Sequence, residues 1–244
     1  MSSAFATGVQ MQAVIVAGGW GSRLESLAGE TAPVLLPVAG RPFIDYLLAH
    51  LVSEGIDDVI LLLDRHAEQV EQHVGVGERH HVRIRTMRDG EFPLDVLGSV
   101  KQVEDWLDST FCLVRGNTYP RVDLGAAYAA FLSRLEPALM VVHANHDARY
   151  PNDVDLRGDS VGRFDVIEPG PHHEYRFAGI TLLRSMVIDE MRPAVPIGEQ
   201  AFYGGLTTDA RLAAYVAGAP SYEITTPETR AHFTEAVARG EIRI

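Results

Sequence analysis

The residues best suited to chemistry in this sequence form a glycine-rich turn, Gly18-Gly19-Trp20-Gly21-Ser22-Arg23, directly after the apolar run Ala13–Ala17. A buried strand that feeds such a turn is how α/β folds bring backbone N–H groups against phosphate. Glycine lacks a Cβ and tolerates positive φ, so an anion can approach the main chain closely. Arg23 adds a planar, permanently charged group whose N–H donors suit phosphate oxygens. The residue types and their order therefore predict a phosphate-binding loop.

Two widespread phosphate loops do not fit this turn. The dinucleotide-binding fingerprint G-x-G-x-x-G would need a glycine where Leu24 stands, and the Walker A pattern G-x-x-x-x-G-K-[ST] occurs nowhere in the chain. The turn and the later run Pro37–Leu48 instead resemble the sugar-1-phosphate nucleotidylyltransferases. That family carries G-G-x-G-x-R-L after its first strand, followed by L-x-P-V-x-G-[KR]-P-[ILM] and an amphipathic helix. Among its members, the short heptose-1-phosphate guanylyltransferases look most similar in length.

The resemblance implies a fold and a reaction. The fold would be α/β, a Rossmann-like three-layer sandwich with a mostly parallel mixed sheet. In the reaction, an oxygen of a sugar-1-phosphate or cyclitol-1-phosphate attacks the α-phosphorus of a nucleoside triphosphate, and pyrophosphate leaves. Charge builds on the non-bridging oxygens, so catalysis depends on positioning and on neutralisation by Mg²⁺, arginine and lysine. The expected partners are an NTP, with a weak preference for GTP, and a sugar-1-phosphate; Mg²⁺ is the expected cofactor, and neither nucleic acid nor membrane is expected.

The same resemblance assigns roles to individual residues. The expected catalytic residues are Arg23, Asn117 and Glu223, of which Asn117 and Glu223 would also bind the metal. The residues expected to contact the nucleotide lie in the turn and at two later positions: Ala17, Gly18, Gly19, Gly21, Ser22, Arg23, Asp95 and Gly98. The residues expected to contact the sugar phosphate are Asn117, Glu168, Tyr175 and Gly179.

The sequence departs from the family pattern at several positions. Pro33 replaces a lysine, Asn117 replaces an aspartate, and Glu223 replaces a second metal-binding aspartate. The family's E-K-P motif reads Ile167-Glu168-Pro169, and Asp95 stands where glycine is usual. Each lost electrostatic contact is typically worth about 3–4 kcal/mol. Three functions therefore stay open.

The first function is an active transferase that uses other cations, for which the candidates are Arg115, Arg121, Arg149 and Arg176. The second is a catalytically degenerate relative that binds a nucleotide or nucleotide-sugar and regulates or scaffolds a partner. A third, a glycosyltransferase, rests on Asp153 and Asp155, which match the D-x-D pattern of metal-dependent members of that class.

Other polar residues have structural interpretations. The adjacent histidines His80-His81 and His172-His173 point in opposite directions along an extended chain, which argues against a joint metal site. Asp123 precedes a helical pattern and is expected to cap it. Cys112 lies in an apolar run and is expected to be an inert core residue.

Alternating strand and helix patterns must position these residues. Apolar runs predict strands at Gln12–Ala17, Asp58–Leu63, Val82–Met87, Phe111–Arg115, Ala138–Ala144 and Arg176–Leu183. Helical periodicity predicts helices at Pro42–Glu54, Ala67–Val74, Gly98–Leu107, Leu124–Leu135, Arg184–Met191, Asp209–Ala217 and Pro227–Arg239. Regular alternation of this kind favours a mostly parallel sheet with helices on both faces.

The composition is that of a globular protein. The chain has 244 residues, of which 46% are hydrophobic and 22% charged, and its formal net charge of −12 disfavours nucleic acid as a partner. A lone cysteine cannot form an intramolecular disulfide, which favours a reducing cytoplasm. Residues 1–10 lack signal-peptide features, and no apolar run reaches the roughly 20 residues that span a bilayer. We therefore expect a tail at 1–10 and a cytoplasmic location. The resemblance implies a single nucleotidyltransferase-like domain at 11–244 and the homo-oligomers that this fold often forms in the family.

Overall fold

The computed structural model describes residues 11–18, 28–90, 94–145 and 150–242. The chain divides into two compact units. The first comprises Met1–Pro93, Val114–Tyr119 and Tyr222–Ile244, and the second comprises Leu94–Leu113 and Pro120–Ser221. The assignment of 11–244 to a single domain stays a prediction.

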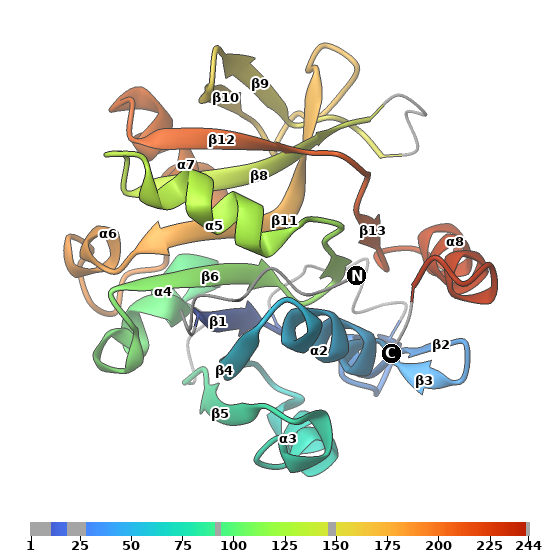
Figure 1. Ribbon diagram of the computed structural model, residues 1–244. Helices are drawn as coiled ribbons and strands as arrows, with labels where there is room; N and C mark the ends of the chain where they lie inside the picture. The colour runs from blue at the N-terminus through green and yellow to red at the C-terminus, as the bar shows by residue number, and fades with distance from the viewer. Residues whose placement is uncertain (1–10, 19–27, 91–93, 146–149, 243–244) are drawn as a thin grey trace. The chain divides into compact units, whose positions relative to one another are not determined.

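The first unit is built on a parallel sheet with the strand order β5-β4-β1 (Figure 1). Its strands are β1 (Met11–Val16), β4 (Ile56–Leu63) and β5 (Arg83–Arg88). The last residues of β6 (Thr110–Arg115) extend this sheet beside β1. β1 is buried along its whole length and β4 along almost all of it. Near-continuous apolar runs of this kind are typical of parallel strands covered on both faces.

Helices and short segments surround this sheet. They are α2 (Phe43–Ser53), α3 (Ala67–Val74), α8 (Pro227–Ala238), the 3₁₀ segments η1 (Pro33–Leu35) and η2 (Glu78–His80), and the ribbons β2–β3 (Pro37–Val38, Arg41–Pro42) and β7–β13 (Thr118–Tyr119, Tyr222–Glu223). α2 buries Ile44, Leu47 and Leu51, which recur at the spacing of one helix face. The helix stops at Ser53, and Gly55 follows with a φ of +90° that glycine adopts without strain.

The second unit contains a mixed sheet with the order β6-β11-β8-β12-β10-β9, to which β6 contributes its first residues. Its other strands are β8 (Ala138–Ala144), β9 (Val154–Arg157), β10 (Ser160–Phe164), β11 (Tyr175–Arg184) and β12 (Leu212–Ala217). β8 pairs with β12 in parallel and with β11 in antiparallel register. β10 pairs antiparallel with both β9 and β12. The sheet is therefore mixed, as the family resemblance implies.

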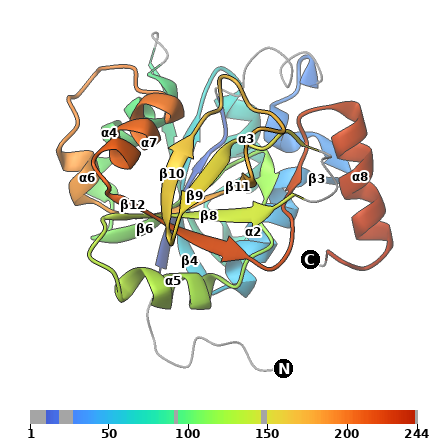
Figure 2. The ribbon, with the colours of Figure 1, turned by 90° about the horizontal axis from the view of Figure 1, so that it is seen from above.

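Helices cover both faces of this second sheet. They are α4 (Asp95–Gln102), α5 (Leu124–Leu132), α6 (Met186–Asp189) and α7 (Glu199–Thr208), with the 3₁₀ segment η3 (Glu104–Trp106) after α4. α5 packs on β8, whereas α7 packs on β10 and β12, on the opposite face (Figure 2). α4 contacts both α6 and α7. The side chain of Asp123 accepts a 2.8 Å hydrogen bond from the amide of Ala126, so the predicted cap of α5 is confirmed.

One predicted helix is wrong. The segment Asp209–Ala217 contains the strand β12, and the helix precedes it as α7. The alanines of Leu212–Ala217 favour a helix by intrinsic propensity. Pairing with β8 along all six residues, with Leu212 and Ala213 almost fully buried, outweighs that preference. The sequence pattern does not predict α7, because the pair Gly204-Gly205 lies within it and glycine is a poor helix former.

The expected α/β class with a mixed sheet is confirmed. In the part of the chain that the structure describes, every helix is too short or too polar to cross a membrane. Cys112 is fully buried, and burial raises the pKa of its thiol, as expected of an inert core residue.

Candidate functional site

The end of β1 is where the predicted phosphate-binding loop begins. Gly19, Gly21, Ser22 and Arg23 lie outside the described residues, so their roles stay predictions. The amide of Ala17 donates to the carbonyl of Leu62 in β4 at 2.8 Å, which fixes the strand end. A Cβ added at Gly18 would lie 2.5 Å from Cγ of Asp64. Glycine is therefore needed at this position for close approach to the residue that follows β4.

A second glycine makes the same edge of the sheet compact. The amide of Gly116, directly after β6, donates to the carbonyl of Val16 at 2.8 Å. A Cβ at Gly116 would lie 2.6 Å from that carbonyl oxygen and 3.1 Å from Cα of Ala17. Both neighbours are backbone atoms that cannot turn away. Gly116 thus holds Asn117 next to the start of the glycine-rich turn.

Asn117 and Glu223, the two predicted metal ligands, lie on adjacent backbone segments. β7 and β13 pair antiparallel with Thr118 opposite Glu223, and the amide of Ile224 donates to the carbonyl of Asn117 at 3.1 Å. Both candidates are only 6% exposed. The hydroxyl of Thr118 donates to Oδ1 of Asn117 at 3.0 Å, which orients the amide group. The fold therefore brings together two residues that are 106 positions apart in the sequence.

An aromatic cluster in the first unit anchors this ribbon. The ring of Phe233 from α8 lies 5.5 Å from Tyr119 of β7 and 5.7 Å from Tyr222 of β13. Phe43 of α2 meets the same ring at 5.2 Å in an edge-on arrangement, which aromatic rings prefer. α8 follows β13 closely in the chain (Figure 1). Its N-terminus carries a reciprocal capping box between Thr226 and Thr229.

A cavity of about 450 Å³ opens at the carboxyl ends of β4 and β5. Its lining residues follow these strands or begin α3: Asp64, Arg65, Ala67, Glu68, Arg88, Asp89 and Gly90. Ligands of open α/β sheets bind outside the carboxyl ends of the strands, and this volume is in the range of small-molecule sites. Arg88 forms an ion pair with Glu71 and holds the pKa of that carboxyl below its usual value. Asp64 is not among the predicted site residues, although a polar residue directly after a buried strand is a signal for this edge.

In the second unit, Asp95 and Gly98 have clear structural roles. Asp95 has a φ of +60°, a conformation that favours glycine and that aspartate tolerates better than most residues. Its Oδ1 accepts a 3.0 Å hydrogen bond from the amide of Val96. A Cβ at Gly98 would lie 2.8 Å from the carbonyl oxygen of Val195, so α4 packs tightly against that segment. The family's glycine at the position of Asp95 is explained by this backbone conformation.

Tyr175 and Gly179, two candidates for sugar-phosphate binding, lie on β11. Gly179 has a φ of +81° and falls where the pairing with β8 shifts register, between Phe177 and Thr181. Such a bulge interrupts the strand and turns backbone groups away from the ladder. Glu168, the third candidate in this unit, lies outside the strands with an exposed side chain, and its amide donates to Asp165 at 2.9 Å. The structure therefore places Tyr175 and Gly179 on one strand and Glu168 on a separate loop.

The D-x-D pair has structural partners. Asp153 is 3% exposed, and its Oδ1 accepts a 2.7 Å hydrogen bond from the amide of Phe177. Oδ2 of Asp155 lies 2.8 Å from Nδ1 of His173, and its Oδ1 accepts from the amide of Glu174 at 3.1 Å. Each carboxylate therefore ties β9 to the segment around β11. This arrangement gives no support to the glycosyltransferase hypothesis.

The four arginines considered as replacement cations differ in burial and in whether the structure describes them. Arg176 is buried, with its guanidinium 5.0 Å from the ring centre of Tyr150, and it donates to the carbonyl of Pro151. That arrangement commits Arg176 to local packing. Arg149 lies outside the described residues, whereas Arg115 and Arg121 are partly exposed. Pro33 is buried as the first residue of η1, so no cation occupies this position.

A glycine-rich sequence directly after a buried parallel strand, together with a mixed α/β sheet, is typical of α/β proteins that bind nucleotides. The model of the "Nucleotidyl transferase" family matches residues 12–150, and the chain belongs to this family.

Individual relatives agree with this membership. A D-glycero-alpha-D-manno-heptose 1-phosphate guanylyltransferase of Aneurinibacillus thermoaerophilus is 30% identical over 124 residues, which is 50% of this chain and 53% of the relative. The chain thus spans about half the length of the curated relatives it matches first. A mannose-1-phosphate guanylyltransferase of Mycobacterium tuberculosis is 26% identical over 95% of this chain and 66% of its own length.

Solved structures match over nearly the whole chain and show the fold. The crystal structure of HddC from Yersinia pseudotuberculosis has a TM-score of 0.78 at 20% identity, covering 93% of this chain and 100% of that one. The inositol-1-phosphate CTP transferase from T. maritima has a TM-score of 0.77 at 15% identity, covering 97% and 99%. The nucleotide-diphospho-sugar transferase fold is therefore shown.

Proposed function

We propose that this protein transfers a nucleoside monophosphate from an NTP to a sugar-1-phosphate or cyclitol-1-phosphate and releases pyrophosphate. The observation that carries the proposal is the pairing of β7 with β13, which brings the backbone of Asn117 against Ile224, the residue after Glu223, at the strand end that Gly116 holds against β1. In this arrangement, two oxygen donors lie in the unit that carries the phosphate-binding loop. Family membership supports the same class of reaction.

The donor set of this ribbon suits Mg²⁺. Amide and carboxylate oxygens are the ligands that this hard cation prefers in proteins. Asn117 Oδ1 accepts one hydrogen bond, from Thr118, and an amide oxygen has a second lone pair for a metal. A bound Mg²⁺ would neutralise charge on the phosphates during transfer. Because the amide is neutral, we expect weaker metal affinity than two carboxylates would give.

The remaining groups would act on the substrates by binding and orientation. The loop after Gly18, with Arg23, would hold the triphosphate through backbone N–H donors and one guanidinium. Holding the α-phosphorus in line with the attacking oxygen supplies much of the rate enhancement in such transfers. Tyr175 and Gly179 stay our candidates for the sugar phosphate, and Asp95 and Gly98 stay our candidates beside the nucleotide. Several relatives are named as guanylyltransferases, which supports a preference for GTP.

One observation favours a second candidate function. Pro33 is buried where the family pattern has a lysine, and Asn117 brings no charge to the metal site. A protein that lacks both charges could bind the nucleotide or nucleotide-sugar without turning it over. It would then regulate or scaffold an active partner.

Substitution of the carboxylate tests the proposed site. Glu223→Gln removes the one formal charge of the donor pair and is expected to lower Mg²⁺-dependent turnover about 100- to 1,000-fold. The matched control is Glu235→Gln, the same change on an exposed residue of α8, and it should leave turnover unaltered. Full activity in Glu223→Gln would overturn the assignment. NTP binding by calorimetry with no turnover in the wild type would favour the degenerate relative.

A further inference from the structure

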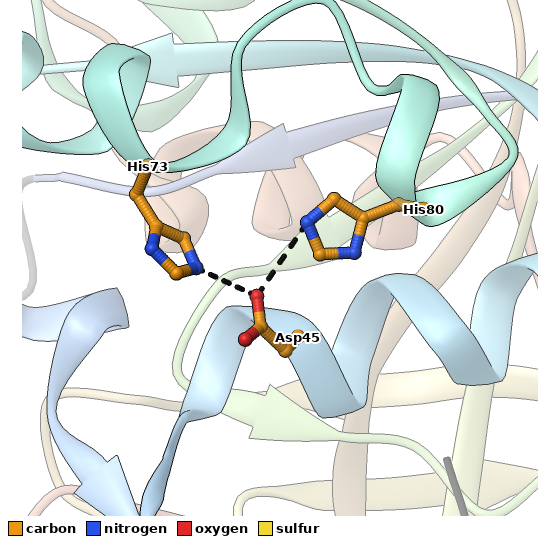
Figure 3. A group of neighbouring side chains, drawn as sticks. All are labelled: Asp45, His73 and His80. Atoms are coloured by element: carbon orange, nitrogen blue, oxygen red, sulfur yellow. Dashed lines mark hydrogen bonds and ion pairs between the residues drawn. The ribbon is translucent and has the colours of Figure 1, made fainter.

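Three potential metal ligands from three elements converge in the first unit (Figure 3). Asp45 lies in the first turn of α2, His73 in the last turn of α3, and His80 in η2. Oδ1 of Asp45 lies 2.7 Å from Nε2 of His73 and 3.5 Å from Nε2 of His80. One ligand atom from each residue lies within 4.8 Å of the other two. The three residues are thus close enough to share one ion.

The chemistry of the cluster matches zinc. Imidazole nitrogens and a carboxylate oxygen are zinc ligands at about 2.0–2.2 Å, so ligand atoms in a tetrahedral site lie about 3.3 Å apart. The Asp45–His80 separation of 3.5 Å is already near this value, and the shorter Asp45–His73 contact would open when both groups turn to an ion.

The side chains are also partly shielded, as a site of stable geometry requires. Exposed fractions are 19% for Asp45, 22% for His73 and 10% for His80. Each residue lies on a helical element rather than on an irregular loop. A cavity of about 500 Å³, lined by Asp45 and His80 among others, adjoins the cluster. Water from this cavity can complete the coordination.

A plain hydrogen bond between Asp45 and His73 is the simpler interpretation, and it would need no third residue. His80 is what it does not explain, because its Nε2 faces the same carboxylate oxygen from a different element. Nε of Arg79 also lies 3.1 Å from His80 Nε2 and competes with an ion for that nitrogen. The Arg79 side chain is exposed and can swing into solvent.

We propose that Asp45, His73 and His80 bind one zinc ion that fastens α2 to α3 and η2. None of the three residues belongs to the sets assigned above to nucleotide, sugar phosphate or magnesium. The proposed role of the ion is structural: zinc that binds only the folded chain would stabilise the folded state by mass action. The site is the protein's own, formed within one unit.

The test uses the purified full chain, stripped with EDTA and titrated calorimetrically with zinc chloride. The wild type should bind one equivalent, and its melting temperature should rise with zinc. His73→Gln and His80→Gln should each weaken binding at least about 100-fold, beyond the 10- to 100-fold that loss of an outer-shell partner costs. Arg79→Gln should bind zinc more tightly, because a competing donor and a positive charge are gone.

The matched control is His81→Asn, which removes an imidazole next to the site. His81 has a φ of +56°, and asparagine tolerates this conformation. Zinc affinity should be unchanged in this variant. Absence of saturable binding in the wild type, or equal affinity in His73→Gln and the wild type, overturns the proposal.

A measurement on the wild type alone tests the site without depending on the correct folding of a variant. Cobalt(II) in a four-coordinate protein site gives an intense visible spectrum, whereas octahedral aqueous cobalt gives a weak one. The intense spectrum is expected on addition of cobalt chloride and should disappear when one equivalent of zinc is added. A spectrum identical to that of aqueous cobalt contradicts the site.

Discussion

Gly116 is the position where one added methyl group should separate the elements of the candidate site. The change is Gly116→Ala. The new Cβ would lie 2.6 Å from the carbonyl oxygen of Val16 and 3.1 Å from Cα of Ala17. Both distances are well inside the roughly 3.5 Å at which carbon contacts become favourable. Because both neighbours are backbone atoms, the strand ends themselves must move apart.

The cost can be worked from these contacts. Overpacking of a tight interior typically costs about 1–3 kcal/mol. Loss of the Gly116–Val16 hydrogen bond, 2.8 Å long, adds about 0.5–1.5 kcal/mol. Together the free energy of unfolding should fall by about 2–4 kcal/mol. A shift near 1 Å at a reacting centre can cost about 100-fold in rate, so turnover should fall as well.

Urea unfolding measures the predicted fall in the free energy of unfolding. The matched control is Gly205→Ala in α7, where an added Cβ meets nothing within 4 Å. That exposed helical glycine should gain about 0.5–1 kcal/mol on replacement by alanine. Equal stabilities for Gly116→Ala and the wild type would refute the close approach of β6 to β1.

Further predictions concern the supports of the first unit. Asp58→Asn should cost about 1.5–3 kcal/mol, because Asp58 accepts hydrogen bonds from Gln12, Arg83 and Arg85 at 2.7–2.9 Å. Burial alone would raise the pKa of Asp58, but these hydrogen bonds outweigh burial and lower the pKa below 3.8. The free energies of unfolding of the mutant and the wild type should therefore differ above pH 3.8 and converge as the pH falls through the native pKa. A pH-independent difference would contradict this assignment. Thr226→Ala removes the capping box of α8 and should cost about 1 kcal/mol in urea unfolding, whereas Thr226→Ser should not; equal losses in both would show that the hydroxyl is not the cause.

Much of the fold could be predicted because its signals are local. The run that becomes β1, the helical spacing of Ile44, Leu47 and Leu51 in α2, and the cap at Asp123 depend on neighbours within a few residues. β12 could not be predicted in this way. Its alanines take a strand conformation only because β8 pairs with them, and that partner is far away in the sequence.

The same contrast between local and long-range signals applies to the residues of the candidate site. Family resemblance named Asn117 and Glu223, and the structure adds the two-residue pairing that brings their backbone segments together. This pairing is too short to leave a periodic signal. Asp45, His73 and His80 have no local spacing rule that connects them. The prediction that adjacent histidines point apart along an extended chain is wrong in its premise, because His80 lies in η2 and His81 has a φ of +56°. The rings of His172 and His173 lie only 4.2 Å apart. His80 meets Asp45 and His73, which lie on other elements.

The most direct test of the account is pyrophosphate release. Purified protein with Mg²⁺ is given each of ATP, GTP, CTP, UTP and dTTP together with hexose-, heptose- and cyclitol-1-phosphates. We predict release that requires both an NTP and a sugar-1-phosphate, that is fastest with GTP, and that is strongly reduced in Glu223→Gln. No release from any pair of substrates, with NTP binding still measurable by calorimetry, would contradict the proposed transferase.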